Sequence, residues 1–340
     1  MNHVNQAKKR NVKRCNADTR FHSEYFTQNC NSLSSSLNDS TMNKSYMFIA
    51  HKEYAAQKPE NVPIVLLHGV TNAKETWDDC AQEIANRTAS QVFCLDARNH
   101  GDSEWTETIG YDSMAEDVVN FMNSRSIPRI TIVGHSMGGK TGMAFAFKYP
   151  ERLESLIIED ISARSPSSSR TGISYYMKQK RDVLMKIPPH AELAEAKKFA
   201  ASYLSGGEAA AKRKLQVNTI APKIWEGRDL PLRMTPSGDF EWKTNLNVIV
   251  NSMESGKWSP VSSDGLYEGP VFLIYGTKSP FKVLEDKEEF LKQFPKTVYQ
   301  SIQDGTHSLH IEYPEIFTNL VCEFVLKIRA STADKHRTGI

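Results

Sequence analysis

The chain has 340 residues, of which 39% are hydrophobic and 24% charged, and its formal net charge is +2. This length suits one large domain with an insertion or two ordinary domains, and the composition is globular rather than disordered or collagen-like. Basic side chains are spread along the chain, which gives no reason to expect nucleic acid as a partner, and no apolar run reaches the roughly 18 residues of a transmembrane segment.

Residues 1–43 are polar and rich in Asn, Ser, Lys and Arg, with few acidic side chains. Such a segment cannot bury a core, so we expect an extension that is either disordered or a targeting sequence. A basic, Ser-rich and acid-poor composition is also typical of mitochondrial transit peptides. The composition favours a transit peptide and a plain disordered extension equally, so the expected location is mitochondrial or otherwise cytoplasmic.

From residue 44 onward, short apolar runs alternate with helical patterns. The runs that predict strands are 46–50, 64–67, 91–95, 130–133, 153–158, 271–275 and 298–302, and those that predict helices are 76–87, 114–124, 138–149, 283–294 and 314–328. Continuous apolar strands that alternate with helices indicate a parallel sheet covered on both faces. We expect an α/β core built from residues 44–162 and 265–330, with a mostly parallel sheet of eight strands.

Residues 163–264 interrupt this alternation. A Ser-rich loop at 164–171 precedes helical patterns at 175–186, 191–203 and 208–217, and no strand of the parallel type is visible. We interpret the segment as a helical cap inserted after the sixth strand. The last dozen residues resemble a frayed tail.

Gly134-His135-Ser136-Met137-Gly138 is a G-x-S-x-G motif that directly follows the strand at 130–133 and directly precedes a helix. The glycines permit a sharp turn that projects the serine hydroxyl over a helix N-terminus, whose dipole favours developing negative charge. The motif in this context predicts Ser136 as the nucleophile of a serine hydrolase.

A serine needs a base within hydrogen-bonding reach. In hydrolases with this elbow the histidine comes last, on the loop after the final strand, and His307 lies there. His310 is the alternative, although we expect it to play a supporting or surface role.

An oxyanion hole needs backbone N–H donors aimed at the developing charge. One donor comes from the residue after the nucleophile, Met137, and the other from the loop after an early strand, where Leu67-His68-Gly69 leads to Val70. We expect the N–H groups of Val70 and Met137 to fill this role.

The acid of the triad is harder to place. The residues after the strand at 271–275 contain no carboxylate, whereas Asp160 follows the strand at 153–158 and can orient the histidine from there. We expect Asp160 to be the acid, with Glu285, Asp286 and Asp304 as alternatives.

Three segments, DARNHGDS at 96–103, GHSMGGKT at 134–141 and DIS at 160–162, resemble the α/β-hydrolase domain-containing protein 11 subfamily and its bacterial esterase relatives. The resemblance covers about 45–328 and implies an α/β-hydrolase fold with a small helical cap, hydrolysis of acyl esters or lipids, and no cofactor. It also implies an acid at Asp160, and a second placement sometimes proposed in the cap falls on Asn247, which is not a carboxylate. His100 and Asp102 we interpret as scaffold residues.

The five cysteines are an odd number at scattered spacings without a C-x-x-C pair, so we expect neither a disulfide framework nor a metal site. The sequence thus predicts a cofactor-free carboxylic ester hydrolase that forms an acyl-enzyme on a small-molecule ester or lipid. The alternative is a catalytically silent member of the same fold that binds or protects another protein.

Overall fold

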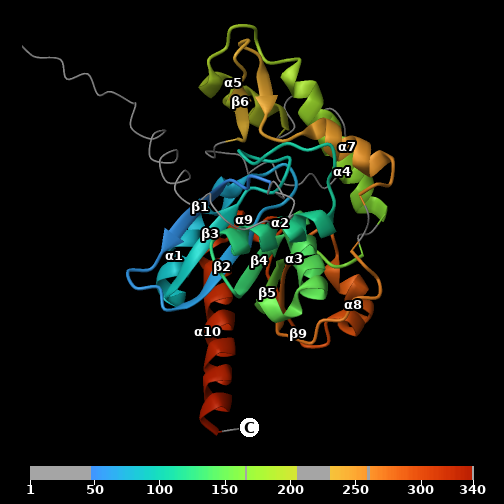
Figure 1. The fold of residues 1–340 in the computed structure, drawn as a ribbon. Coiled ribbons are helices and arrows are strands. Elements are labelled where there is room, and N and C mark those ends of the chain that lie inside the picture. The colour runs from blue at the N-terminus through green and yellow to red at the C-terminus, as the bar shows by residue number, and fades with distance from the viewer. Residues whose placement is uncertain (1–46, 165–166, 205–229, 259–260, 339–340) are drawn as a thin grey trace, which may run out of the picture. The chain divides into compact units, whose positions relative to one another are not determined.

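The computed structural model describes residues 47–164, 167–204, 230–258 and 261–338, and seven strands in these ranges form one sheet in the order β1-β3-β2-β4-β5-β8-β9 (Figure 1). All neighbouring strands pair in parallel except β1, which is antiparallel to β3. The strands are β1 (His51–Ala55), β2 (Asn61–Leu67), β3 (Ser90–Leu95), β4 (Ile130–His135), β5 (Leu153–Glu159), β8 (Val271–Gly276) and β9 (Thr297–Ile302).

The mostly parallel sheet is confirmed, but within the described residues it has seven strands where eight were expected. The apolar run that predicted a strand at 46–50 leads into β1 without forming a strand of its own. It lies beside the loop after β3, where the Asp96 N–H donates to the Ala50 carbonyl at 2.9 Å and the Glu104 N–H to the Phe48 carbonyl at 3.1 Å.

Helices cover both faces of the sheet because the strands carry apolar side chains on both sides. In β2, Ile64 and Leu66 pack with α1 and α10, whereas Val65 and Leu67 face the opposite layer, which contains α2 and α3. The core helices are α1 (Asp78–Thr88), α2 (Tyr111–Ser124), α3 (Met137–Lys148), α8 (Lys287–Gln293), α9 (Leu309–Glu312) and α10 (Pro314–Thr338), with short 3₁₀ turns η1 (Lys74–Trp77), η2 (Pro150–Arg152) and η4 (Val283–Asp286). The final helix continues to Thr338, so the frayed tail expected for the last dozen residues is largely helical.

Arg329 connects α10 by hydrogen bonds to the amino-terminal ends of three strands. Its guanidinium donates to the Glu154 carboxylate at 3.0 and 3.1 Å, to the Val62 carbonyl at 2.8 Å and to the Ser90 hydroxyl at 3.0 Å. These acceptors belong to β5, β2 and β3. The planar guanidinium suits this role because its five N–H donors point in fixed directions.

The cap follows β5, the fifth strand of the sheet in chain order rather than the expected sixth. Its elements are α4 (Ser167–Leu184), α5 (Leu193–Leu204), β6 (Leu232–Met234), β7 (Phe240–Trp242) and α7 (Leu246–Glu254). Two expectations are corrected, since α4 begins inside the stretch expected to be a Ser-rich loop, and β6 and β7 form an antiparallel hairpin where no strand was foreseen. At only three residues each, these strands are too short for an alternating pattern to be visible in the sequence.

The cap packs on the core through its own apolar cluster, in which Met177, Trp242 and Ile249 join Met114 and Met137 of the core. The extension expected at 1–43 and the helix expected at 208–217 lie outside the described residues. Among those that are described, no helix combines the length and the apolar character needed to cross a bilayer.

Candidate active site

Ser136 occupies the sharp turn between β4 and α3. Its backbone has φ 50° and ψ −108°, a left-handed conformation that a serine adopts only under strain, and the residue is 8% exposed. The glycines of the motif are required for close approach, because a Cβ at Gly134 would collide with the backbone of Gly138, and one at Gly138 would collide with Leu67. The turn therefore places the hydroxyl at the carboxyl end of β4, beside the N-terminus of α3.

Asp160 and His307 form a buried pair. The Nδ1 atom of His307 lies 2.7 Å from Asp160 Oδ2, and the side chains are 6% and 0% exposed. Asp160 also accepts hydrogen bonds from the Gly276 N–H at 3.0 Å and from the Ser279 hydroxyl. The ring of Phe281 stacks on the imidazole with centroids 3.8 Å apart, which limits how the ring can tilt.

The charges of this pair are set by burial. It lowers the pKa of His307 to about 3, so the imidazole is neutral and can accept a proton. It also raises the pKa of Asp160, and the hydrogen bonds from Ser279 and Gly276 oppose that rise because they stabilise the carboxylate.

Strand register brings the predicted nucleophile and acid close together. His135 pairs with Glu159 at the ends of β4 and β5, and the next residue of each strand, Ser136 and Asp160, leaves the sheet with positive φ. The Ser136 N–H donates to the Glu159 carbonyl at 3.1 Å. His307 arrives on the loop after β9, where its carbonyl accepts a hydrogen bond from His135 at 2.9 Å. Ser136 and His307 share the wall of a small cavity.

The two backbone N–H groups predicted to form the oxyanion hole are not engaged in other hydrogen bonds within the described residues. The N–H groups of Val70 and Met137 donate to no other atom of the described residues. The loop that carries Val70 is held through the next residue, Thr71, whose N–H donates to His100 Nε2 at 3.2 Å and whose carbonyl accepts from Lys180 at 3.3 Å. Burial lowers the pKa of His100 to about 3, which leaves it neutral and able to accept. His100 thus has the scaffold role expected from the sequence.

His310 and Glu159 form a second buried pair next to the first. His310 Nδ1 is 2.8 Å from both oxygens of Glu159, and its N–H donates to the same carboxylate at 3.0 Å, while its Nε2 lies 2.9 Å from the Thr76 hydroxyl. His135 stands between the two histidines of the site, 4.7 Å from the His307 ring and 5.0 Å from the His310 ring. His310 therefore links the loop that carries His307 to Glu159 at the end of β5, and its burial excludes the surface role that the sequence had left open.

Within the described residues, one group of side chains has the spacing of a metal site. It consists of His135, Glu159 and His310, whose possible ligand atoms lie within 4.8 Å of one another. The chemistry of this group argues against an ion. Glu159 and both nitrogens of His310 already make hydrogen bonds, and His135 Nε2 bonds to a carbonyl. A network that orients the His307 loop accounts for all of these contacts except the buried His135 Nδ1, which has no hydrogen-bond partner.

The alternative acids do not contact His307. Asp304 and Glu285 are exposed and each pairs with a lysine, at 2.8 and 3.3 Å. Asp286 accepts from the backbone N–H of Arg164 at 3.1 Å and borders a larger cavity. Of the candidate acids, Asp160 is the one within hydrogen-bonding distance of the imidazole.

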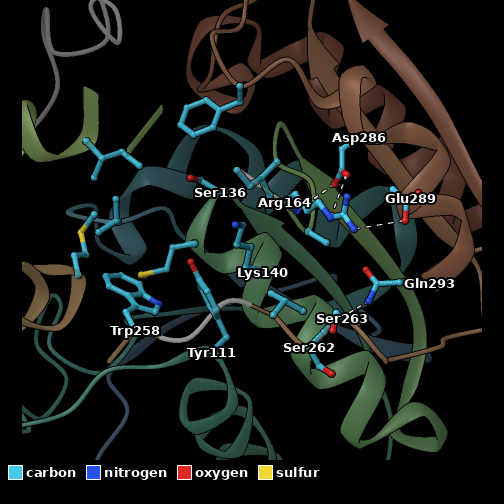
Figure 2. A pocket seen from close by; sticks show the side chains of 18 of the residues that line it. Tyr111, Ser136, Lys140, Arg164, Trp258, Ser262, Ser263, Asp286, Glu289 and Gln293 are labelled. Atoms are coloured by element: carbon cyan, nitrogen blue, oxygen red, sulfur yellow. Dashed lines mark hydrogen bonds and ion pairs between the residues drawn. The ribbon is translucent and has the colours of Figure 1, made fainter. Parts of the chain in front are cut away.

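The larger cavity, of about 690 Å³, opens beside Ser136 (Figure 2). Its wall contains both apolar and charged side chains. Apolar residues of the wall include Val70, Met137, Ile173, Met253, Trp258 and Phe281, and charged ones include Lys140, Arg164, Asp286, Glu289 and Lys292. Its size fits a small ester or part of a lipid.

The fold and the elbow can now be compared with known proteins. A profile of the α/β hydrolase fold matches residues 62–314, which is most of the chain. The chain belongs to the α/β-hydrolase fold family. It is 31% identical to the Xenopus laevis protein named sn-1-specific diacylglycerol lipase ABHD11, over 77% of this chain and 79% of that protein.

Two further likenesses extend the comparison within this α/β-hydrolase family. Ethanol acetyltransferase 1 of Cyberlindnera fabianii is 28% identical over 81% of this chain and 82% of its own length. Among solved structures, a marine microorganism esterase shares the fold with a TM-score of 0.62 and 22% identity, covering 82% of this chain and 99% of that one. The family assignment made from the motifs is thereby confirmed.

Sequence reasoning missed several residues around Ser136. Lys140 and Tyr111 of the cavity wall, Phe281 on the imidazole and Ser279 on Asp160 were not singled out. A signal existed for Lys140, because residues four apart share one face of a helix. The others come from loops and helices distant in sequence, and no local pattern connects them to the elbow.

Proposed function

We propose that this α/β-hydrolase cleaves carboxylic esters through Ser136, His307 and Asp160. His307 Nε2 takes the Ser136 proton as the hydroxyl attacks the ester carbonyl, and the oxyanion accepts hydrogen bonds from the Val70 and Met137 N–H groups. The protonated imidazole then gives its proton to the departing alcohol. A water activated by His307 hydrolyses the acyl-enzyme, and no cofactor takes part.

The observation that carries this proposal is the buried His307–Asp160 pair at 2.7 Å, beside a strained serine and two N–H groups that bond to no other described residue. A neutral imidazole whose Nδ1 faces a carboxylate presents a free lone pair at Nε2. The names of the relatives, a diacylglycerol lipase and an esterase, support ester substrates, and the cavity volume fits a small ester or lipid.

A fluorophosphonate probe and a para-nitrophenyl ester test the proposal. The wild type is expected to be labelled and to hydrolyse the ester, and Ser136→Ala is expected to lose both activities. Ser308→Ala is the matched control, because Ser308 borders the same small cavity and has no assigned role. Labelling that persists in Ser136→Ala would contradict the nucleophile, and a wild type that neither labels nor turns over would favour the catalytically silent alternative.

An alcohol is a second candidate for the acceptor of the acyl group. The likeness to ethanol acetyltransferase 1 favours it, because an acyl-enzyme reacts with any hydroxyl that reaches it. Ethanol added to the ester assay is then expected to yield the ethyl ester at the expense of free acid, measured by gas chromatography. Unchanged acid yield would assign water as the acceptor.

We also propose that residues 1–43 direct the protein to mitochondria, on the basis of their basic, acid-poor composition. Fusion of this segment to a fluorescent protein tests the idea. Co-localisation with a mitochondrial dye is expected, and diffuse cytoplasmic fluorescence would contradict it.

A further inference from the structure

Thr71 forms a strained turn directly after Val70, which carries one of the two proposed oxyanion donors. Its φ is 66°, a left-handed conformation that a β-branched residue rarely adopts, and the residue is 1% exposed. Such strain persists only where the surrounding structure holds the backbone in place. The groups that hold Thr71 therefore decide where the neighbouring Val70 N–H points.

Hydrogen bonds fix the peptide groups on both sides of Thr71. Its N–H donates to His100 Nε2 at 3.2 Å, and its carbonyl accepts from Lys180 Nζ at 3.3 Å. His100 is suited to accept at Nε2 because its Nδ1 lies 2.9 Å from the Arg98 carbonyl, to which it donates. Neither His100 nor Lys180 takes part in the chemical steps proposed above.

Lys180 comes from the cap, where it lies on α4 and is fully buried. Its Nζ is 4.0 Å from the centre of the Trp242 ring and 5.6 Å from that of the Tyr176 ring. The indole N–H of Trp242 also donates to the Lys180 carbonyl at 2.7 Å. These contacts restrict both the backbone and the amine of Lys180, so the amine reaches the Thr71 carbonyl from a fixed direction.

The cap also holds the loop that carries His100. The Gly101 N–H donates to the Lys243 carbonyl at 2.6 Å, and the Asn245 N–H donates to the Asn99 carbonyl at 2.8 Å. Both cap residues lie between β7 and α7, which is a second segment of the cap. Both hydrogen bonds that fix the strained turn therefore depend on a docked cap.

We propose that Lys180 is a positioning residue that ties the cap to the oxyanion hole by holding the strained turn of Thr71. The inference rests on the proposed ester hydrolysis and deepens it. When the lysine donor is lost, the turn can relax and the Val70 N–H no longer points at the developing charge. Displacement of a group at the reacting centre by about 1 Å can cost about a hundredfold in rate. Because the oxyanion forms only as the reaction proceeds, the loss should appear in kcat rather than in KM.

Lys180→Met tests the proposal, because it removes the N–H donor and puts an apolar side chain of similar length in a buried site, which a folded core tolerates. With para-nitrophenyl butyrate, kcat is expected to fall about tenfold to a hundredfold while KM stays within about threefold of the wild-type value. A trifluoromethyl ketone is attacked by Ser136 and forms an oxyanion in the same hole. Its inhibition constant is therefore expected to rise by about the factor by which kcat falls.

Val183→Ala is the matched control. Val183 is a fully buried residue of α4 that packs in the apolar cluster of the cap and lines neither cavity. The variant is expected to lower the free energy of unfolding but to leave kcat and the inhibition constant within about threefold of wild type.

Thr71→Gly provides a second test, because glycine adopts a positive φ without strain and the turn then needs less support. In this background, Lys180→Met is expected to lower kcat by less than about threefold. A kcat of Lys180→Met close to that of wild type, an equal loss in Val183→Ala, or an undiminished loss in the Thr71→Gly background would overturn the positioning role and leave the hydrolase proposal standing. A wild type that does not hydrolyse the ester would overturn both.

Discussion

Replacing Asp160 by Asn tests the assignment of the acid. The carboxylate accepts from His307 Nδ1 at 2.7 Å, from the Gly276 N–H at 3.0 Å and from the Ser279 hydroxyl. An Asn side chain keeps one oxygen as acceptor and turns an amide N–H₂ toward the imidazole. The ring then has to accept at Nδ1 and carry its proton on Nε2, where it can no longer take the proton of Ser136.

We expect kcat of Asp160→Asn to fall about a thousandfold to ten-thousandfold, as when other triads lose the correct tautomer. This corresponds to about 4–5.5 kcal/mol of transition-state stabilisation. Because the exchange also disturbs buried hydrogen bonds, the free energy of unfolding is expected to fall by about 1–3 kcal/mol. Steady-state hydrolysis of a para-nitrophenyl ester and denaturant unfolding measure the two effects separately.

Glu159→Gln is the matched control. Glu159 is the preceding residue and is equally buried, but its carboxylate bonds to His310 rather than to His307. We expect a similar loss of stability and less than about a tenfold loss of kcat, because the tautomer of His307 is unaffected. Equal losses of kcat in both variants, or a nearly normal kcat in Asp160→Asn, would refute the reasoning.

Three further predictions concern pH and packing. Because burial lowers the pKa of His307 to about 3, the imidazole is neutral above about pH 4, and kcat/KM of the folded enzyme should not fall as the pH drops through 6.5. A fall near pH 6.5, with unchanged tryptophan fluorescence, would contradict the assignment of His307 as the base. Gly69→Ala would place a Cβ 2.5 Å from His135 Nδ1 and should cost about 1–3 kcal/mol in thermal unfolding, whereas Gly110→Ala, whose Cβ meets nothing closer than 3.6 Å, should not. Burial lowers the pKa of Lys180 to about 7, so between about pH 7 and 10.5 the unfolded chain binds more protons than the folded one. The free energy of unfolding of the wild type should therefore rise relative to that of Lys180→Met as the pH rises from 7 to 9. A difference in unfolding free energy that stays constant over this range would contradict the prediction.

The residues of the candidate site could be predicted from the sequence because local rules determine their positions. The elbow needs glycines around Ser136, and parallel strands bring their carboxyl ends to one edge, so Asp160 and His307 could be placed from their positions after strands. The contacts of these residues agree with that placement. Asp160 departs from the commoner position of the acid, and it was predicted because no carboxylate follows the strand at 271–275.

The cavity could not be derived in the same way. Trp258 and Met253 come from the cap, Tyr111 from the start of α2 and Phe281 from the loop after β8, and only tertiary packing brings them together. The β6–β7 hairpin also depends on its surroundings, since Trp242 is buried against the cap and donates its indole N–H to the Lys180 carbonyl at 2.7 Å. Short strands stabilised by such contacts leave little periodic signal.

The attachment of the last helix by Arg329 bears on how the protein is synthesised. Ser136 and Asp160 are translated well before His307, which belongs to the final segment of the chain. A nascent chain that ends before β9 therefore holds the proposed nucleophile and acid but lacks the proposed base, and its newest strand has an uncovered edge. Esterase activity appearing during translation would thus report the moment at which the carboxyl-terminal segment has docked.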